Sequence, residues 1–460
     1  MRHKLSRIGF IFYLKPLIEE KTMMKKSWLL LMLLTLLIVP VVSAENAGDD
    51  FVFGDPLPNA PELAARGDYQ VGVQALELID EGRVDILSAT SDDPSPLYDR
   101  PLMVEVWYPA DLADGEIEMT EYNDFLGRAD VAEAPNIPFS FAGRAARDAA
   151  PNNTDAPYPL VIVSHGFPGS AYMMTYLNEN LASKGYVVVA IAHTDSTFTD
   201  TAAFGSTLLN RTLDQWFVLD EMARLSAADD GFLSGLVDAD NTAIIGYSMG
   251  GYGALNAIGA GYNGLAANFG PGANIDVLVA GNEDYIASQD DRIKAAVLFA
   301  PWGGNLGGIG LANASLWDEE ALADITVPTL WAVGDEDDVS LFVGVETLFD
   351  WSINSERYLL IYENALHNVA PNPPPAEATE FAQFERYSEP AWNERRINNI
   401  NQHFVTAFLG LHLKGMTEYA AYLDMPVERS NDGSVDEETY WPGFPPRTAL
   451  GLRFIAAGSE

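Results

Sequence analysis

The sequence predicts an α/β fold, a mostly parallel and doubly wound sheet of about eight strands that carries loop insertions. After residue 150, apolar β-branched runs alternate with helical patterns, which is typical of strand–helix–strand units in a parallel sheet. The turn Gly246-Tyr247-Ser248-Met249-Gly250 follows the apolar run Thr242–Ile245 and precedes a small-residue segment with a helical pattern. A strand, a G-x-S-x-G turn and a helix form a nucleophile elbow, which lifts the serine hydroxyl clear of the sheet.

Apolar patterns along the chain predict eight strands and five helices. The strands are expected near residues 71–78, 101–108, 159–164, 186–191, 242–246, 294–300, 327–333 and 357–362. The first two are close together without a helical pattern between them, so we expect an antiparallel edge of the sheet. The helices are expected near residues 171–184, 207–226, 249–259, 339–350 and 396–414. The 207–226 segment repeats apolar residues at helical intervals, which indicates a stripe packed on the core.

Three segments do not fit the alternation of strands and helices. Residues 110–157 are polar, acidic and rich in Pro and Asn, residues 261–291 are rich in Gly, Ala and Asn, and residues 370–395 are rich in Pro. Such segments form lids and specificity elements or decorate the surface, and the sequence leaves both roles open. No repeat or compositional break marks a second domain, so residues 45–460 are expected to form a single domain.

The first 44 residues have the features of a secretory signal peptide with an upstream extension. Basic Lys25-Lys26 precedes the apolar stretch Trp28–Val42, which is too short to span a bilayer, and the small residues Val42-Ser43-Ala44 follow. A retained membrane anchor is the alternative, but Pro40 and the small residues after it favour cleavage. We therefore expect cleavage near Ala44, export from the cell and no stable membrane anchor.

The composition excludes several classes of function. The chain has a formal net charge of −40; residues 1–44 carry seven basic and two acidic residues, so residues 45–460 retain 19 basic and 64 acidic ones. A surface with a net charge of −45 repels nucleic acid and anionic membranes, so neither is expected as a partner. The absence of cysteine excludes disulfides, a thiol nucleophile and thiolate metal sites.

The elbow, and the order of the chemistry-bearing residues after it, resemble the α/β-hydrolase superfamily over roughly residues 70–455. In that superfamily the nucleophile is followed by an Asp or Glu and then by a His, each in a loop at the carboxyl end of a strand. A serine hydroxyl needs a neighbouring base to take its proton, and a carboxylate must orient that base. The resemblance implies an α/β-hydrolase fold with Ser248 as the nucleophile.

Three histidines lie far enough downstream to be the base. His403 and His412 fall within the amphipathic segment 396–414, where a packing or surface role is expected. His367 comes five residues after the predicted strand Arg357–Tyr362, in a loop that can reach back over the elbow. His367 is therefore the predicted base.

The acid is expected at the end of the preceding strand. The run Val327–Val333 leads into Gly334 and four consecutive carboxylates, only one of which can orient the histidine. The residues alone leave Asp335, Asp337 and Asp338 as candidates. The G-x-x-D pattern of the superfamily implies Asp337.

An oxyanion formed during acyl transfer needs two backbone N–H donors. Met249, which directly follows the nucleophile, is expected to supply one. The loop after the strand Leu160–Ser164 is expected to supply the other, from Phe167, because Pro168 has no N–H. Two further histidines, His165 and His193, are expected to brace their loops.

Within the superfamily, several stretches resemble the platelet-activating-factor acetylhydrolase and dienelactone-hydrolase-like group. They are RPLMVEVWYPA, VIVSHGFPGS, LASKGYVVVAIAHTDST, GYSMGG and the terminal YWPGFPPRTALGLR. The acetylhydrolases place their acid after the strand that here ends in Ala300-Pro301-Trp302, which has no carboxylate. Dienelactone hydrolases use a cysteine nucleophile, which this chain lacks.

GYSMGG, IKAAVLFAPW and VPTLWAVGDEDD resemble bacterial cutinases and polyester hydrolases, although those enzymes are shorter and lack the three insertions. That resemblance implies that Phe167, Met249 and Trp302 contact the acyl group of a substrate. A packing role for Trp302 remains the alternative, since buried Trp more often packs than recognises ligands.

Together these features predict a secreted serine carboxylic-ester hydrolase that acts on a small-molecule or polymeric ester without metal or organic cofactor. The alternatives are a cutinase-like polyester hydrolase, a phospholipase or acetylhydrolase of the platelet-activating-factor type, a peptidase of the same fold, and a non-catalytic binding protein on this scaffold.

Overall fold

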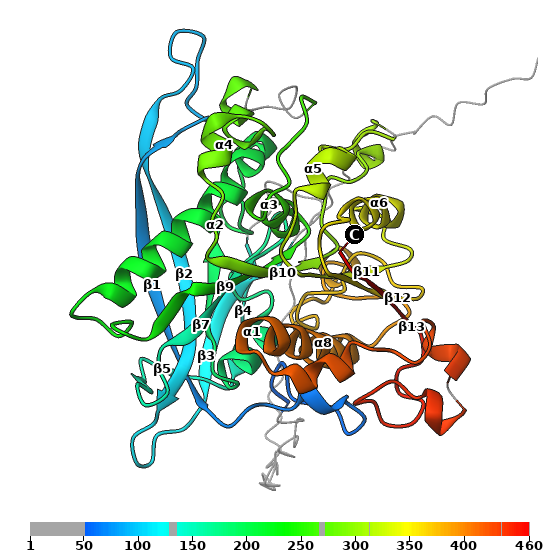
Figure 1. The fold of residues 1–460 in the computed structure, drawn as a ribbon. Coiled ribbons are helices and arrows are strands. Elements are labelled where there is room, and N and C mark those ends of the chain that lie inside the picture. The colour runs from blue at the N-terminus through cyan, green and yellow to red at the C-terminus, as the bar shows by residue number, and fades with distance from the viewer. Residues whose placement is uncertain (1–50, 128–135, 266–271, 312, 434, 460) are drawn as a thin grey trace, which may run out of the picture. The chain divides into compact units, whose positions relative to one another are not determined.

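The protein is built around one large twisted sheet with helices on both faces (Figure 1). The computed structural model describes residues 51–127, 136–265, 272–311, 313–433 and 435–459. The predicted leader and its cleavage site lie outside the described residues. All described residues belong to one compact unit, Phe51–Glu460.

Within the described residues, the main sheet has eleven strands. Ten of them follow the order β13-β12-β11-β10-β9-β7-β8-β2-β1-β5, and β6 pairs with β2. Six neighbouring strands, from β12 to β8, are parallel. At the edges, β13 is antiparallel to β12, β2 is antiparallel to both β8 and β1, and the short β5 is parallel to β1. The strand bounds are β1 Gln70–Val84, β2 Leu97–Asp111, β5 Ala146–Arg147, β6 Ala150–Pro151, β7 Tyr158–Ser164, β8 Val187–Ala192, β9 Val237–Tyr247, β10 Ile293–Phe299, β11 Thr329–Gly334, β12 Arg357–Tyr362 and β13 Leu452–Ala457.

All eight predicted strands are present, and the predicted α/β fold class is confirmed. The first two form a longer antiparallel hairpin than predicted, because β1 and β2 continue as a two-stranded ribbon beyond the body of the sheet (Figure 1). In the described part of the chain, the sheet has three strands more than predicted. Two of them, β5 and β6, are two residues long, and β13 follows a long Pro-containing tail that offers no local helix or strand pattern.

The helices form a layer on each face of the sheet. The five predicted helices correspond to α1 Thr175–Ala182, α2 Phe204–Ala227, α3 Met249–Ala257, α6 Phe342–Trp351 and α8 Glu394–Lys414. Helices α1 and α8 pack against each other and cover one face, while α2, α3 and α6 cover the other. Helix α8 begins where the side chain of Asn393 accepts a hydrogen bond from the backbone N–H of Arg396, which satisfies a donor of its first turn.

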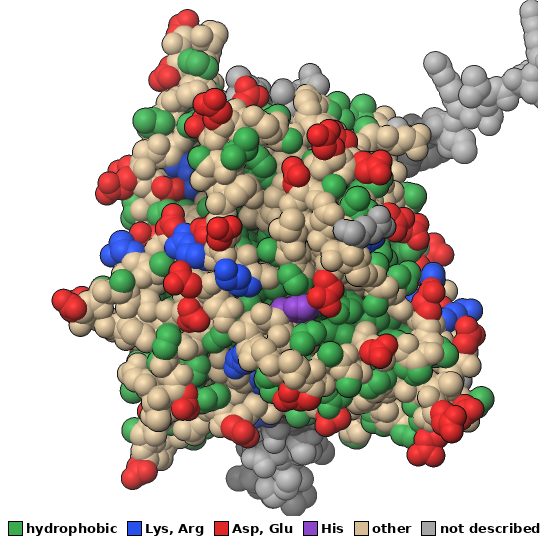
Figure 2. All heavy atoms as spheres, viewed as in Figure 1, with side chains coloured by type: hydrophobic (Ala, Val, Ile, Leu, Met, Phe, Trp, Pro, Cys, Tyr) green, Lys and Arg blue, Asp and Glu red, His purple; other side chains and the backbone are tan. Residues whose placement is uncertain are grey.

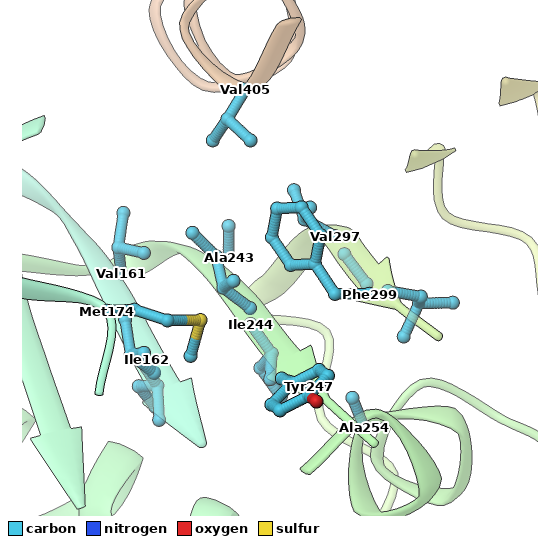
Figure 3. Close-up of a cluster of buried hydrophobic side chains, with 14 of the residues drawn as sticks. Val161, Ile162, Met174, Ala243, Ile244, Tyr247, Ala254, Val297, Phe299 and Val405 are labelled. Carbon is cyan, nitrogen blue, oxygen red and sulfur yellow. The ribbon is translucent and has the colours of Figure 1, made fainter. Parts of the chain in front are cut away.

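Successive side chains of the central strands point to opposite faces of the sheet, so a hydrophobic core forms on each face. In Figure 3, β9 lies between Val405 of α8 on one side and Ala254 of α3 on the other. Neighbouring strands add Val161, Ile162, Val297 and Phe299, and all of these side chains are buried. Each such side chain contributes about 1.5–3 kcal/mol when fully buried, so this core holds the strand ends in fixed positions.

The three predicted insertions form different local structures. The 110–157 segment forms a separate hairpin of β3 Thr120–Phe125 and β4 Pro138–Gly143, together with β5 and β6. The 370–395 segment contains the short helix α7 Phe381–Phe384, and the 261–291 segment contains α4 Glu283–Ala287. The short helix α5 Glu319–Ala323 lies before β11.

Two of these insertions pack on each other although they are far apart in the sequence. Leu126 and Phe139 of the first segment form a buried apolar cluster with Ala378 and Tyr387 of the 370–395 segment. The hydroxyl of Tyr387 accepts a hydrogen bond of 2.7 Å from the backbone N–H of Gly127. These two insertions are therefore joined by a small core of their own.

The visible surface carries scattered carboxylates and fewer basic side chains (Figure 2). Within the described part of the chain, no helix combines the length and the apolar character needed to cross a bilayer.

Candidate active site

The predicted nucleophile lies in a tight turn between β9 and α3. Ser248 has a φ of 53° and ψ of −113°, a conformation that costs a non-glycine residue energy and is typical of functional turns. Its backbone N–H donates to the carbonyl of Phe299 (2.9 Å), and its carbonyl accepts from the N–H of Trp302 (3.1 Å). These bonds to the end of β10 hold the strained residue in place.

The glycines on either side of the turn are required by close packing. A Cβ atom on Gly246 would lie 2.4 Å from the carbonyl oxygen of Gly250, and one on Gly250 would lie 1.9 Å from that of Ser164. Any larger residue would force the elbow away from the neighbouring strand β7. The sequence pattern therefore has a steric cause.

The structure brings together His367 and Asp337 across the ends of β11 and β12. His367 Nδ1 donates to Asp337 Oδ2 at 2.8 Å, and both side chains are buried. With its proton on Nδ1, the imidazole leaves Nε2 free to accept a proton. Ser248 and His367 line the same cavity.

Asp337 is held ionised by its surroundings. Burial alone would raise the pKa of its carboxyl, but the charge and hydrogen bond of His367 and the N–H groups of Val339 and Ser340 bring the pKa below its ordinary value. The other carboxylates of the turn are placed differently. Asp335 accepts from the backbone N–H of Asn364 (2.6 Å), and Asp338 is exposed at the cavity.

The loop that contains Phe167 is held from behind by Arg211 of α2. The buried guanidinium donates to the carbonyls of His165 and Gly166, the second at 2.9 Å. In a trans peptide the N–H points opposite to the C=O. The Phe167 N–H therefore points away from Arg211, and Gly166 and Phe167 line the cavity beside Ser248.

Met249 is the first residue of α3, where the N–H groups of a helix have no acceptor within the helix. Its N–H and that of Phe167 are thus placed on the two segments that flank the nucleophile. Both are the residues that the sequence predicts as oxyanion donors.

A second Ser–His–Asp arrangement lies beneath this loop. Ser164 Oγ is 2.8 Å from His193 Nε2, and His193 Nδ1 donates to Asp214 Oδ2 at 2.9 Å. All three residues are fully buried, so Ser164 is out of reach of a substrate. Arg100 forms a bidentate ion pair with Asp214. This network braces the loops after β7 and β8.

Burial keeps both histidines behind the site neutral. It lowers the pKa of His193 to about 3, with the charge of Arg211 adding to the effect. Burial and Arg211 also lower the pKa of His165 well below its usual range. His165 Nδ1 donates to the carbonyl of Gly166 (2.6 Å), and its Nε2 accepts from the N–H of His193 (3.3 Å).

The remaining histidine candidates lie in α8. His403 is buried against Phe404, Tyr422 and Phe444, and it accepts from the N–H of Leu63 (3.2 Å). His412 packs on Phe408. Neither residue lines the cavity at Ser248.

The cavity beside Ser248 has a volume of about 290 Å³. Its wall includes Phe167, Tyr247 and five residues of the 370–395 insertion, which are Phe381, Glu385, Arg386, Ser388 and Pro390. Arg386 also donates to the carbonyl of Pro168 (3.1 Å), so the insertion is tied to the Phe167 loop. The insertion is thus a wall of the candidate site.

Of the three side chains predicted to contact an acyl group, Phe167 lines the cavity, whereas Met249 and Trp302 are absent from its described lining. Trp302 is buried edge-on against Phe204 and Tyr252, and Phe204 in turn packs on Phe167. Phe167 is thus the one of the three that faces this cavity, and the packing role that was the alternative for Trp302 is favoured. The side chain of Trp302 follows the sharp turn after β10 into the layer of α2 and α3.

A larger cleft of about 990 Å³ lies at the opposite ends of the strands. It is lined by residues at the start of β10 and just before β11, including Ile293, Thr326 and Pro328, and by carboxylates such as Asp291 and Asp324. None of the predicted site residues lines it. In the described part of the chain, no group of three or more His, Cys, Asp or Glu residues is arranged to hold a metal ion.

Sequence reasoning did not identify Arg211, Arg386 or Glu389 as parts of this site. Glu389 binds the backbone on both sides of His367. Each residue acts on backbone groups far away in the sequence, and no local motif marks such a contact.

Comparison with known proteins is consistent with this geometry. A family model described as PET hydrolase-like matches residues 142–267, which include the Phe167 loop and the elbow. Cutinase est1 from Thermobifida alba is 30% identical over 231 residues, which cover 48% of this chain and 56% of the relative. Cutinase est2 from the same organism is 30% identical over 187 residues, covering 39% of this chain and 41% of the relative. The chain thus spans about half the length of the relatives it matches.

Two further similarities are more distant. Dipeptidyl aminopeptidase BIII from Pseudoxanthomonas mexicana is 27% identical over 240 residues, covering 48% of this chain and 32% of the relative. The structure of a ferulic acid esterase from Streptomyces cinnamoneus aligns over 77% of this chain and 94% of its own, with 21% identity and a TM-score of 0.49. This protein thus resembles cutinases over somewhat less than half of its length, and a PET hydrolase-like family model in the region of the elbow.

Proposed function

We propose that the protein is a serine carboxylic-ester hydrolase that works through an acyl-enzyme on Ser248. The observation that carries the proposal is the bond between His367 Nδ1 and Asp337, with His367 and the strained Ser248 facing one cavity. The similarity to cutinases and to a PET hydrolase-like model supports it.

In the proposed reaction, Ser248 Oγ attacks the ester carbonyl while His367 Nε2 takes its proton. The N–H groups of Met249 and Phe167 bind the oxyanion, and Asp337 stabilises the imidazolium. The imidazolium then gives its proton to the leaving alcohol. Water attacks the acyl-enzyme with His367 again as base, which releases the acid and restores Ser248. No step needs a metal or organic cofactor.

A polyester is the second candidate substrate, since the matched family model is described as PET hydrolase-like. The insertion that walls the cavity favours smaller esters, because it leaves a site of about 290 Å³. Activity on p-nitrophenyl esters, triglycerides, phospholipids and polyester film, compared side by side, separates these substrates. An anilide substrate in the same series tests the peptidase alternative.

The proposal includes export from the cell, which is based on the signal-peptide pattern of residues 1–44. A mature amino terminus just after Ala44 in the extracellular or periplasmic fraction is the expected result of sequencing the isolated protein. An intact leader on cell-bound protein would contradict it.

The first prediction tests the triad. Ser248→Ala and His367→Ala are each expected to lower kcat by several powers of ten with the fold intact, and Asp337→Asn by about 10⁴. Asp335→Asn and Asp338→Asn serve as matched controls and should retain most activity. Ester hydrolysis, fluorophosphonate labelling of Ser248 and the melting temperature (Tm) are measured for each variant. A wild-type protein that neither hydrolyses esters nor reacts at Ser248 would instead be a binding protein.

A further inference from the structure

The carboxylate of Glu389 lies buried beside the loop of the proposed base. Only 3% of the residue is exposed. Its Oε2 accepts from the backbone N–H of Leu366, and its Oε1 accepts from that of Asn368, each at 2.5 Å. The two oxygens therefore bind the backbone on both sides of His367.

The same insertion makes further contacts with this loop. The side-chain amide of Asn368 donates to the carbonyl of Glu385 (2.7 Å) and to that of Ser388 (3.2 Å). On the other side, Tyr247 donates to the side-chain oxygen of Asn368 (3.2 Å). The imidazole is thus fixed by Asp337 through its ring and by Glu389 through its backbone.

We propose that Glu389 is a positioning residue for His367, whose carboxylate holds the histidine backbone and whose charge stabilises the imidazolium formed during the reaction. The inference deepens the proposed function and rests on it, since it concerns the same base. The two carboxylates have different roles, because Asp337 orients the ring whereas Glu389 sets the position from which the ring projects.

The surroundings of Glu389 give this role a pH dependence. Burial raises the pKa of Glu389 to about 7, against the lowering effect of the Leu366 and Asn368 N–H groups and of His367; Asp337 raises it further. From α8, Glu394 accepts the backbone N–H of Glu389 (3.0 Å), and Arg386 and Tyr247 are the other titratable groups nearby. Below this pKa, one Glu389 oxygen carries a proton and becomes a weaker acceptor, which weakens its hydrogen bond with the backbone N–H.

The test is Glu389→Gln, whose amide NH₂ must face one of the two backbone N–H groups. We expect kcat to fall about 10- to 100-fold, because a small misplacement of a catalytic group has effects of this size, with KM little changed. The acid limb of the kcat/KM profile should also move to lower pH, because a negative charge beside the imidazole is removed. Glu377→Gln, the same change at an exposed site of the same insertion, is the control and should leave both unchanged.

The number of active sites is counted with a fluorophosphonate, so that loss of folded protein is separated from loss of rate. Full kcat in folded Glu389→Gln, an unmoved acid limb, or a loss explained by fewer labelled sites would each overturn the inference. If that variant does not fold, Glu389→Asp keeps the charge and both oxygens on a shorter stem. It should lower kcat while keeping the wild-type acid limb, and wild-type kcat in Glu389→Asp would then assign Glu389 to folding alone.

These outcomes are distinct from failure of the proposed function. If wild-type protein shows neither ester hydrolysis nor labelling of Ser248, the proposed function fails. If wild-type protein is active and Glu389→Gln is equally active, only the positioning role fails.

Discussion

Aromatic side chains around Ser248 divide into those that face the cavity and those that are buried behind it. Phe381 of α7 lines the cavity and is 76% exposed. Trp302, which follows β10, is 9% exposed and packs on Phe204 and Tyr252. An exposed aromatic side chain at a site can contact a substrate, whereas a buried one mainly supports the fold.

The two positions should therefore respond differently to removal of the ring. Phe381→Ala is expected to raise KM for bulky aromatic esters several-fold more than for butyrate esters, with Tm unchanged. Trp302→Ala is expected to destabilise the fold by about 3–5 kcal/mol, the usual cost of truncating a buried Trp, and to affect both ester classes equally. If Trp302→Ala instead lost activity on aromatic esters selectively, Trp302 would be assigned to the substrate-binding site.

At the scale of the elements, a buried carboxylate joins the β3–β4 hairpin to helix α1. Glu179 of α1 accepts from the hydroxyl of Tyr122 on β3 (2.8 Å) and from the backbone N–H of Arg144, just after β4 (2.9 Å). The residue is 2% exposed. Burial raises the pKa of Glu179 to about 7, although the charge of Arg66 and these hydrogen bonds lower it.

This raised pKa makes the attachment of the hairpin sensitive to pH. An unfolded chain releases the Glu proton near pH 4.3, while the folded protein keeps it to about 7. Between these values the folded state binds more protons, so the stability contributed by Glu179 is greatest at low pH and declines as pH rises. Glu179→Gln, which cannot ionise, should lower Tm more at pH 5.5 than at pH 8.5.

The matched control is Glu77→Gln on the exposed face of β1, for which the difference from wild type should be the same at both pH values. If the Tm difference between wild type and Glu179→Gln is equally independent of pH, the carboxyl of Glu179 does not titrate in this range. The buried bond to Tyr122 would then be a simple hydrogen bond between fixed charge states.

At the scale of the whole molecule, the distribution of charge is the main feature. The chain has a net charge of −40, with 66 acidic and 26 basic residues. Several of the few cations are used internally: Arg83 and Arg100 pair with Asp214, and Arg211 binds backbone carbonyls. Carboxylates on the surface are therefore left without enough partners, as the scattered acidic groups in Figure 2 illustrate.

Repulsion among these carboxylates should make stability depend on salt. Raising NaCl from about 0.05 M to about 1 M shortens the Debye length to roughly 3 Å and screens the repulsion, so Tm should rise. An uncharged osmolyte at equal osmolality is the control, since it does not screen charge. A Tm that stays flat or falls over this range of NaCl would show that the surface charges are already compensated.

The sequence by itself determined the fold class and the chemistry-bearing residues that the structure brings together. The apolar patterns of strands and helices reflect which side chains are buried. When a parallel sheet is covered on both faces, its strands are apolar throughout, so each strand can be predicted from its own residues. The G-x-S-x-G turn is a local sequence pattern, and the clash that excludes a larger residue at Gly246 is with Gly250 of the same turn, although the clash at Gly250 is with Ser164 of β7. Since parallel strands end at one edge, the loops with Asp337 and His367 had to meet there.

Only the tertiary structure decided what surrounds that edge. It selected Asp337 over Asp335 and Asp338 as the partner of His367 by side-chain direction, and it placed Trp302 in the core. It also joined the insertions 110–157 and 370–395 and brought Glu389 to the backbone of His367. Such contacts leave no pattern in the sequence, because a buried carboxylate needs N–H donors and the backbone can supply them whatever the side chain is. Which backbone N–H groups reach the carboxylate is decided by the tertiary structure alone.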